Sequence, residues 1–242
     1  MHRFFVDRNN IDYSKRTAFI EGEDAKHISR VLRLRENDNV VLCDGCESEY
    51  TAAIFKINQR RVDLRLSDEK KTETEPGLRI TLYQCLPKAG KMELIIQKCV
   101  ELGVYEIVPV ISNRCVVKVS DDDVRGRVGR WQRVALEAAK QSGRGIIPKV
   151  KEPVEIGRIS AGRHALFLIA DEEERSATLK SVLRANKGIL DLGLLIGPEG
   201  GLERAEVSGI PGAFPFTLGR RILRTETAGM AVIAMILFET EG

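Results

Sequence analysis

The sequence has no hydrophobic run long enough to cross a membrane. Its longest apolar stretch, Ala228 to Phe238, is well short of the roughly 20 residues that a membrane-spanning helix needs. Charged side chains interrupt the first residues, Met1 to Asp7, before an apolar segment can develop, so the pattern of a secretory signal peptide is missing. We therefore expect a water-soluble, cytoplasmic protein.

Cysteine and histidine are too sparse to indicate a metal centre. Five cysteines without a regular spacing do not suggest a disulfide framework. Cys43 and Cys46 form a C-x-x-C motif, which is half of a zinc site, but no second close pair of cysteines or histidines accompanies it. Asp44-Gly45 between two apolar runs is typical of a hairpin turn. We predict a turn with two free thiols and no bound metal.

The sequence also lacks a strong overall charge, since the net charge is only +3. The charge is unevenly distributed, however, because residues 1–35 hold eight basic and five acidic side chains. A local excess of positive charge is what a polyanionic partner responds to. The amino-terminal region is therefore the first candidate for binding nucleic acid.

The first 70 residues are predicted to form mostly β-structure. Arg61 to Leu66 strictly alternates polar and apolar residues, as a half-buried strand does. Further strands are expected at residues 4–6, 40–42 and 50–57, and together they suggest a small barrel.

One helix is expected at residues 25–33, with Asp24 as its N-cap. Helical spacing places an apolar group on one side, namely Ala25, Ile28, Val31 and Leu32. The opposite side carries Lys26, Arg30 and Arg33, and it is predicted to face solvent.

A second domain is predicted after residues 67–77, a segment without apolar residues that resembles a linker. Beyond it, predicted strands alternate with helices. The strands lie at residues 78–86, 105–111, 164–170 and 192–196, and the helices at residues 92–102, 121–139 and 177–185. This alternation favours a largely parallel sheet covered on both faces.

Two segments stand where ligands bind in such sheets, beyond the carboxyl ends of strands. Residues 196–201 (IGPEGG) match neither common phosphate-loop pattern, and Glu199 would repel a phosphate. A glycine-rich backbone with a carboxylate better suits an uncharged nucleoside joined to a cation, such as S-adenosylmethionine, although a plain turn is the alternative. The missing dinucleotide pattern disfavours a nicotinamide-dependent enzyme.

The second segment, residues 218–228 (LGRRILRTETA), carries three arginines within five residues. Such a cluster suits a phosphate-rich substrate or a carboxylate partner. The alternative is a solvated helix start whose arginines pair with local acids such as Glu226. From the residues alone, an enzyme and an RNA-binding protein are both possible.

Five motifs occur in an order that resembles a known family. They are His27 with Arg30-Val31-Leu32-Arg33, KCVELGV at 98–104, QSGR at 141–144, IGPEGG at 196–201 and LGRRILRTETA at 218–228. Together they resemble the 16S ribosomal RNA uridine-N3 methyltransferases of the SPOUT superfamily, over nearly the whole chain.

The resemblance implies an α/β protein with two domains. Residues 1–70 would be a PUA-like β-barrel that binds RNA. Residues 76–242 would be a SPOUT methyltransferase domain with a carboxyl-terminal trefoil knot, which is rare among folds. It also implies bound S-adenosylmethionine, a substrate that is 16S rRNA or the small ribosomal subunit, and a homodimer with each active site near the subunit interface.

The resemblance further implies which residues form the site. The expected cofactor-binding residues are Leu168, Ile169, Ile196, Gly197, Gly200, Leu218, Gly219, Ile222, Leu223, Thr225 and Ala228. The expected catalytic residues are Arg224, which would stabilise charge on the uracil, Glu199, as a base or a partner of the cofactor's cationic end, and Arg114, which would hold the flipped nucleotide. For each of them an ion pair within the dimer is the alternative. The expected RNA contacts are Arg3, Lys26, Arg30, Arg33 and Arg144. A non-catalytic ribosome assembly factor is the alternative function.

Overall fold

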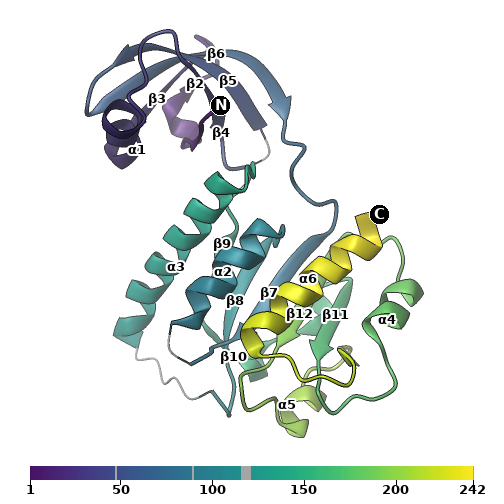
Figure 1. Cartoon of the computed structure of the whole chain (residues 1–242). Coiled ribbons are helices and arrows are strands. Elements are labelled where there is room, and N and C mark those ends of the chain that lie inside the picture. The colour runs from purple at the N-terminus through teal and green to yellow at the C-terminus, as the bar shows by residue number, and fades with distance from the viewer. Residues whose placement is uncertain (47, 89, 116–120, 242) are drawn as a thin grey trace. The chain divides into compact units, whose positions relative to one another are not determined.

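The computed structural model describes residues 1–241 except residues 47, 89 and 116–120. The chain forms two compact units (Figure 1). One contains residues 1–75 together with 139–147, and the other contains residues 76–138 and the chain from 148 onward. Among the described residues, no helix combines the length and the apolar character that a membrane crossing requires.

The first unit is built on a six-stranded sheet. Its strand order is β1-β4-β5-β6-β3-β2, and all neighbours are antiparallel except β1 and β4. The strands are β1 (Arg3–Phe5), β2 (Ile11–Asp12), β3 (Thr17–Glu21), β4 (Asn39–Cys43), β5 (Ser48–Ile57) and β6 (Arg61–Lys71). Alternate residues of β3 and β6 are buried, so the period-two pattern of the sequence sets the inner face.

The predicted linker begins too early. Strand β6 continues to Lys71, and its residues 69–71 pair with residues 48–50 of β5. The end of β6 is exposed, so its side chains can all be polar. A polar segment of this kind has the composition of a linker, and for this reason the strand was not predicted.

The predicted helix at residues 25–33 is divided into α1 (Gly22–Lys26) and a π-helical turn over His27–Val31. Ala25 and Ile28 are fully buried as predicted, but Val31 is 66% exposed. A π turn is wider than an α turn, so the side chains after His27 leave the 100° spacing that placed Val31 inside. Asp24 is not the N-cap either, because it lies within α1 and pairs with Lys140.

The C-x-x-C segment is the turn that its Asp-Gly pair indicated. Asp44 Oδ1 accepts hydrogen bonds from the backbone of Cys46 and Ser48, at 2.8 and 3.1 Å. Both thiols are free.

The second unit is a seven-stranded parallel sheet with helices, which confirms the predicted α/β class. Its strand order is β10-β8-β7-β12-β11-β13, with β9 beside β8. The strands are β7 (Arg79–Cys85), β8 (Glu106–Ile111), β9 (Lys149–Val150), β10 (Val154–Glu155), β11 (Leu166–Ala170), β12 (Asp191–Ile196) and β13 (Phe214–Phe216). The helices are α2 (Lys91–Glu101), α3 (Asp121–Gln141), α4 (Leu179–Ala185), α5 (Arg204–Ser208) and α6 (Thr225–Glu241). Helices α2 and α6 pack against each other along the sheet (Figure 1).

The parallel arrangement decides where a ligand can bind. Strands β11, β12 and β13 are neighbours or one strand apart, and all run in the same direction. Their carboxyl ends therefore bring the segments after Ala170, Ile196 and Phe216 to one edge of the sheet. This edge is where open α/β sheets bind their ligands.

Candidate functional site

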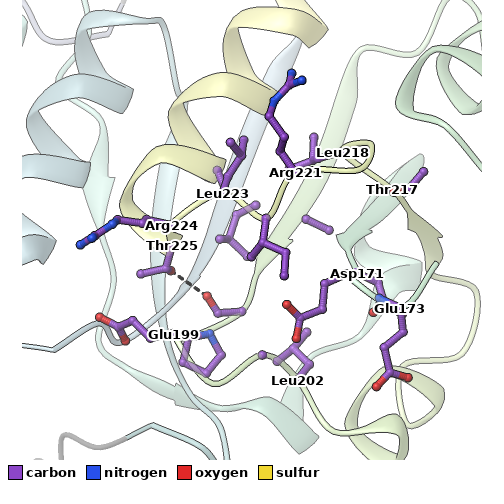
Figure 2. A pocket seen from close by; sticks show the side chains of 18 of the residues that line it. Asp171, Glu173, Glu199, Leu202, Thr217, Leu218, Arg221, Leu223, Arg224 and Thr225 are labelled. Atoms are coloured by element: carbon purple, nitrogen blue, oxygen red, sulfur yellow. Dashed lines mark hydrogen bonds between the residues drawn. The ribbon is translucent and has the colours of Figure 1, made fainter. Parts of the chain in front are cut away.

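A cavity of about 640 Å³ lies at this edge of the sheet (Figure 2). Its walls come from the segments after β11 (170–175), β12 (196–202) and β13 (217–224), and from the start of α6. A volume of this order suits a small-molecule ligand or cofactor.

Thr225 joins three of the elements around the cavity. Its hydroxyl donates a hydrogen bond to the carbonyl of Gly197, at 2.7 Å, and accepts one from the side-chain amide of Gln84, at 3.0 Å. Thr225 and Gln84 are both buried. The start of α6, the segment after β12 and strand β7 are thus fixed to one another by buried hydrogen bonds, which favours a preformed site.

Lys91 ties two carboxylates at the cavity rim. Its ammonium lies 3.3 Å from Glu199 and 3.2 Å from Glu226, and the backbone N–H of Lys88 also donates to Glu199. Partial burial works to raise the pKa of the Glu199 carboxyl, but the hydrogen bonds from the backbone and from Lys91 outweigh it and hold this pKa below its ordinary value. Glu199 is therefore ionised at neutral pH and is a weak proton acceptor, which argues against its expected role as a base.

Gly201 is required where it stands. Its φ is +71°, and a Cβ at this position would come within 2.6 Å of Glu172 Oε1. Both the backbone conformation and the close approach of this carboxylate exclude a larger residue unless Glu172 moves.

Most of the expected cofactor-binding residues lie together at this cavity. Eight of them line it: Ile196, Gly197, Leu218, Gly219, Ile222, Leu223, Thr225 and Ala228. Leu168 and Ile169 do not, since both are fully buried within β11, and Ala170 at the end of that strand reaches the cavity instead. Gly200 is outside the lining, and its carbonyl accepts a hydrogen bond from Arg114.

One wall of the cavity was not predicted from the sequence. The acidic segment Asp171–Glu173 directly follows β11 and contributes to the lining, as does Leu202. The rule that ligands bind beyond carboxyl ends of parallel strands applies to β11 as well as to β12, so the segment could have been found.

The expected catalytic arginines differ in their positions. Arg224 is exposed and lines the cavity. In Figure 2 its side chain extends to the side of the cavity where Glu199 lies, whereas Arg221 extends away from both. Arg114 supports the segment after β12 from outside, because its guanidinium donates to the carbonyl of Gly200 at 2.9 Å and lies 3.6 Å from Glu203.

Three of the expected RNA contacts are on the surface of the first unit. Lys26, Arg30 and Arg33 are exposed. Lys26 pairs with Glu23, and Arg30 is hydrogen-bonded to Gln59. These contacts are themselves exposed, so they leave the cations accessible to a phosphate.

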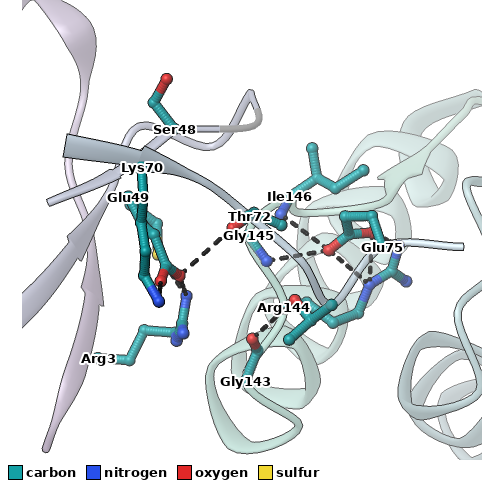
Figure 3. A network of polar contacts seen from close by, with 12 residues as sticks. Arg3, Ser48, Glu49, Lys70, Thr72, Glu75, Gly143, Arg144, Gly145 and Ile146 are labelled. Carbon is teal, nitrogen blue, oxygen red and sulfur yellow. Dashed lines mark hydrogen bonds and ion pairs between the residues drawn. The ribbon is translucent and has the colours of Figure 1, made fainter.

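The other two expected contacts point into the first unit, which corrects the prediction (Figure 3). Arg3 donates to Glu49 at 2.7 Å, and only 17% of its side chain is exposed. Arg144 is 3% exposed and binds the carboxylate of Glu75. Glu75 also accepts from the backbone N–H of Gly145, at 2.9 Å. Both arginines stabilise the unit and are not available to RNA in this conformation.

Comparison with known proteins agrees with this architecture. Residues 20–67 match the RNA methyltransferase PUA domain family, and residues 74–237 match the RNA methyltransferase domain family. This chain belongs to the RNA methyltransferase family. The matched methyltransferase domain contains the whole lining of the cavity.

Relatives of this methyltransferase resemble it over their full lengths. It is 30% identical over 250 residues to ribosomal RNA small subunit methyltransferase E of Bacillus subtilis, which covers 100% of this chain and 98% of the relative. A crystal structure of ribosomal RNA small subunit methyltransferase E from Neisseria gonorrhoeae, bound to S-adenosylmethionine, has a TM-score of 0.84 and 31% identity, covering 99% and 98% of the two chains. A Legionella pneumophila protein solved with bound S-adenosylmethionine has a TM-score of 0.85 and 28% identity, covering 98% and 97%.

Proposed function

We propose that this protein transfers the methyl group of S-adenosylmethionine to ring nitrogen 3 of a uridine in 16S ribosomal RNA. The observation that carries the proposal is the preformed cavity between residues 196–202 and 217–228. Further support comes from relatives similar over their full lengths that are named as methyltransferases of small-subunit ribosomal RNA, one of them solved with S-adenosylmethionine.

The residues at the cavity suit this cofactor. Ile196, Leu218 and Leu223 supply apolar surface for an adenosine, and glycines allow the backbone to approach it closely. Carboxylates after β11 supply negative charge for the cationic end. When bound, S-adenosylmethionine supplies the methyl group, and the chain orients it for in-line displacement.

We assign the chemistry of the substrate to Arg224. The N3 proton of uridine must leave, so negative charge develops on the uracil ring, and an exposed guanidinium at the cavity can stabilise it. That edge of uracil is paired in a duplex, so the target base must be unpaired or flipped out. Glu199 and Arg114 hold the segment after β12 in position rather than moving a proton.

We further propose that the second unit is a SPOUT domain in which the carboxyl-terminal segment forms a trefoil knot. Residues 196–202 and 217–228 would be the knotted segments, and the hydrogen bond of Thr225 to Gly197 supports their association. In this proposal residues 1–70 bind RNA and residues 76–242 carry out catalysis.

The proposal is tested by incubating the protein with unmethylated 16S rRNA or small ribosomal subunits and S-adenosylmethionine that carries a labelled methyl group. The RNA is then digested to nucleosides, which are separated and identified by mass. We expect 3-methyluridine as the labelled product. Label in another nucleoside would refute the assignment to N3, and unlabelled RNA from both substrates would refute the reaction.

Replacing Arg30 with alanine is expected to weaken the salt dependence of RNA binding. Each lost phosphate contact lowers the slope of log affinity against log salt by roughly 0.7–0.9. Affinity for a 16S rRNA fragment is measured at several salt concentrations. Arg184→Ala, which removes the same charge from an exposed side chain of α4, serves as the control and should leave the slope unchanged. An unchanged slope in the Arg30 variant would show that this surface is merely solvated.

Helix α6 supports the proposed homodimer. The helix is apolar on nearly all sides, but in the single chain only one side is covered. Val232, Ile233 and Ile236 are fully buried, whereas Met235 is 43% and Phe238 is 82% exposed. Since exposed apolar patches often mark interfaces, we propose that a second copy of the chain covers this side.

Replacing Phe238 with aspartate is expected to shift the protein from dimer to monomer, because a carboxylate would be buried unpaired in the interface. Sedimentation velocity at micromolar concentration measures the change. Leu190, which is 71% exposed elsewhere, gives a matched control, and Leu190→Asp should stay dimeric. A wild-type protein that sediments only as a monomer would contradict the proposed dimer.

A further inference from the structure

The carboxylate of Glu172 lies at the cavity and has no partner among the residues that the structure describes. Glu172 follows β11 and contributes to the cavity lining. Its Oε1 lies against Gly201, whose missing Cβ leaves room for it. Within the described part of the chain, it forms no hydrogen bond or ion pair.

The other carboxylates of this lining are already occupied. Glu199 binds Lys91 and the backbone of Lys88. Asp171 accepts a hydrogen bond from the backbone of Glu173, and the carboxylate of Glu173 pairs with Arg204. Of these four carboxylates, Glu172 is the one to which the described residues provide neither a hydrogen bond nor an ion pair, so its charge is the least compensated.

We propose that Glu172 provides the counter-charge for a cationic group of the bound cofactor. The inference rests on the proposed binding of S-adenosylmethionine, which has a sulfonium and an ammonium group. Glu199 was expected to have this role, but its carboxylate already pairs with Lys91 and accepts a hydrogen bond from the backbone of Lys88.

Which of the two cationic groups pairs with Glu172 affects how the product is exchanged for a new methyl donor. During methyl transfer the S–CH₃ bond breaks, its electron pair stays on sulfur, and a bond forms between the methyl carbon and N3 of uracil, whose proton passes to solvent water. The sulfonium thereby becomes a neutral thioether. A carboxylate paired with the sulfonium would attract the methyl donor but not the demethylated product, and it would favour exchange of product for donor.

The test is a calorimetric titration of the wild-type protein and of Glu172→Gln with three ligands. S-adenosylmethionine has both cationic groups, S-adenosylhomocysteine has only the ammonium, and methylthioadenosine has neither. We expect the variant to bind S-adenosylmethionine roughly tenfold more weakly than the wild type, as loss of one attraction between opposite charges does. The matched control is Glu155→Gln, which removes the same charge from an exposed position of the second unit outside the cavity lining and should have little effect on all three ligands.

The loss of affinity of the Glu172 variant is compared over the three ligands. Weaker binding of S-adenosylmethionine alone supports a pair with the sulfonium, and equal weakening for S-adenosylhomocysteine supports a pair with the ammonium. Equal weakening for methylthioadenosine as well, or no weakening at all, would overturn the proposal. If the wild type binds none of the three, the proposed function itself fails, and the role of Glu172 fails with it.

Discussion

Replacing Arg224 with alanine is expected to lower kcat roughly 100-fold, as loss of one group that stabilises transition-state charge does. The dissociation constant of S-adenosylmethionine should change by no more than about twofold, because the guanidinium acts on the uracil and not on the methyl donor. Single-turnover methylation of 16S rRNA gives the rate, and calorimetry gives the dissociation constant.

The neighbouring Arg221 provides the control for this prediction. It belongs to the same segment, but its side chain extends away from Glu199 and Arg224 (Figure 2). Arg221→Ala should therefore reduce kcat much less than Arg224→Ala does. If the two variants lose activity equally, the effect reflects the total charge of the segment and not a specific role of Arg224. If Arg224→Ala retains full activity, Arg224 has no part in the mechanism.

Replacing Arg144 with alanine is expected to destabilise the first unit by about 3 kcal/mol, because it leaves the carboxylate of Glu75 buried without its partner. The side chains of Arg144 and Glu75 are 3% and 13% exposed. The free energy of unfolding is measured by denaturant titration, followed with a probe that reports on the first unit. Arg60→Ala, at an exposed turn, should leave the stability almost unchanged.

The same variant separates the two roles considered for Arg144. The resemblance implied a contact with RNA, whereas the structure gives it a buried ion pair. An Arg144→Ala protein with wild-type stability and weakened RNA binding would restore the first role. A destabilised protein that, at a temperature where it is folded, binds the 16S rRNA fragment as the wild type does would support the second.

The sequence predicted the second unit better than the first. Leu192 to Ile196 is an apolar run bounded by polar residues and glycine, and such a run in an alternating β/α pattern indicates a buried parallel strand. Strand β13 (Phe214–Phe216) was missed, since three residues with a central proline carry no periodic signal. Strand β3 (Thr17–Glu21) was also not predicted. Its buried and exposed residues do alternate, but five residues are too few for this pattern to stand out in the sequence.

The packing of segments that lie far apart in the sequence could not be predicted. The turn after α3 belongs to the first unit, although it follows a helix that begins in the second. Gly145 shows the physical reason, because a Cβ there would overlap Thr72, which lies far away in the sequence. No local pattern tells which core a turn will pack against, so the sequence could not distinguish an RNA contact of Arg144 from the ion pair with Glu75.

The candidate site was predicted in outline because its residues lie in two continuous segments. The glycines of residues 196–201 and the apolar residues of 218–228 identified most of the lining. What the sequence could not supply was which charges are already paired. Lys91 lies 108 residues before Glu199 in the sequence and pairs with it, so the difference between the paired Glu199 and Glu172 became visible only in the folded chain.

The most direct test of the whole account is a calorimetric titration of the purified protein with S-adenosylmethionine. The account predicts binding at one site per chain, and loss of that binding when Gly201 is replaced by a bulky residue such as leucine, provided that circular dichroism shows the variant to be folded. Absence of cofactor binding in a wild-type protein that still binds 16S rRNA would contradict the account. The protein would then be better described as a non-catalytic factor in ribosome assembly.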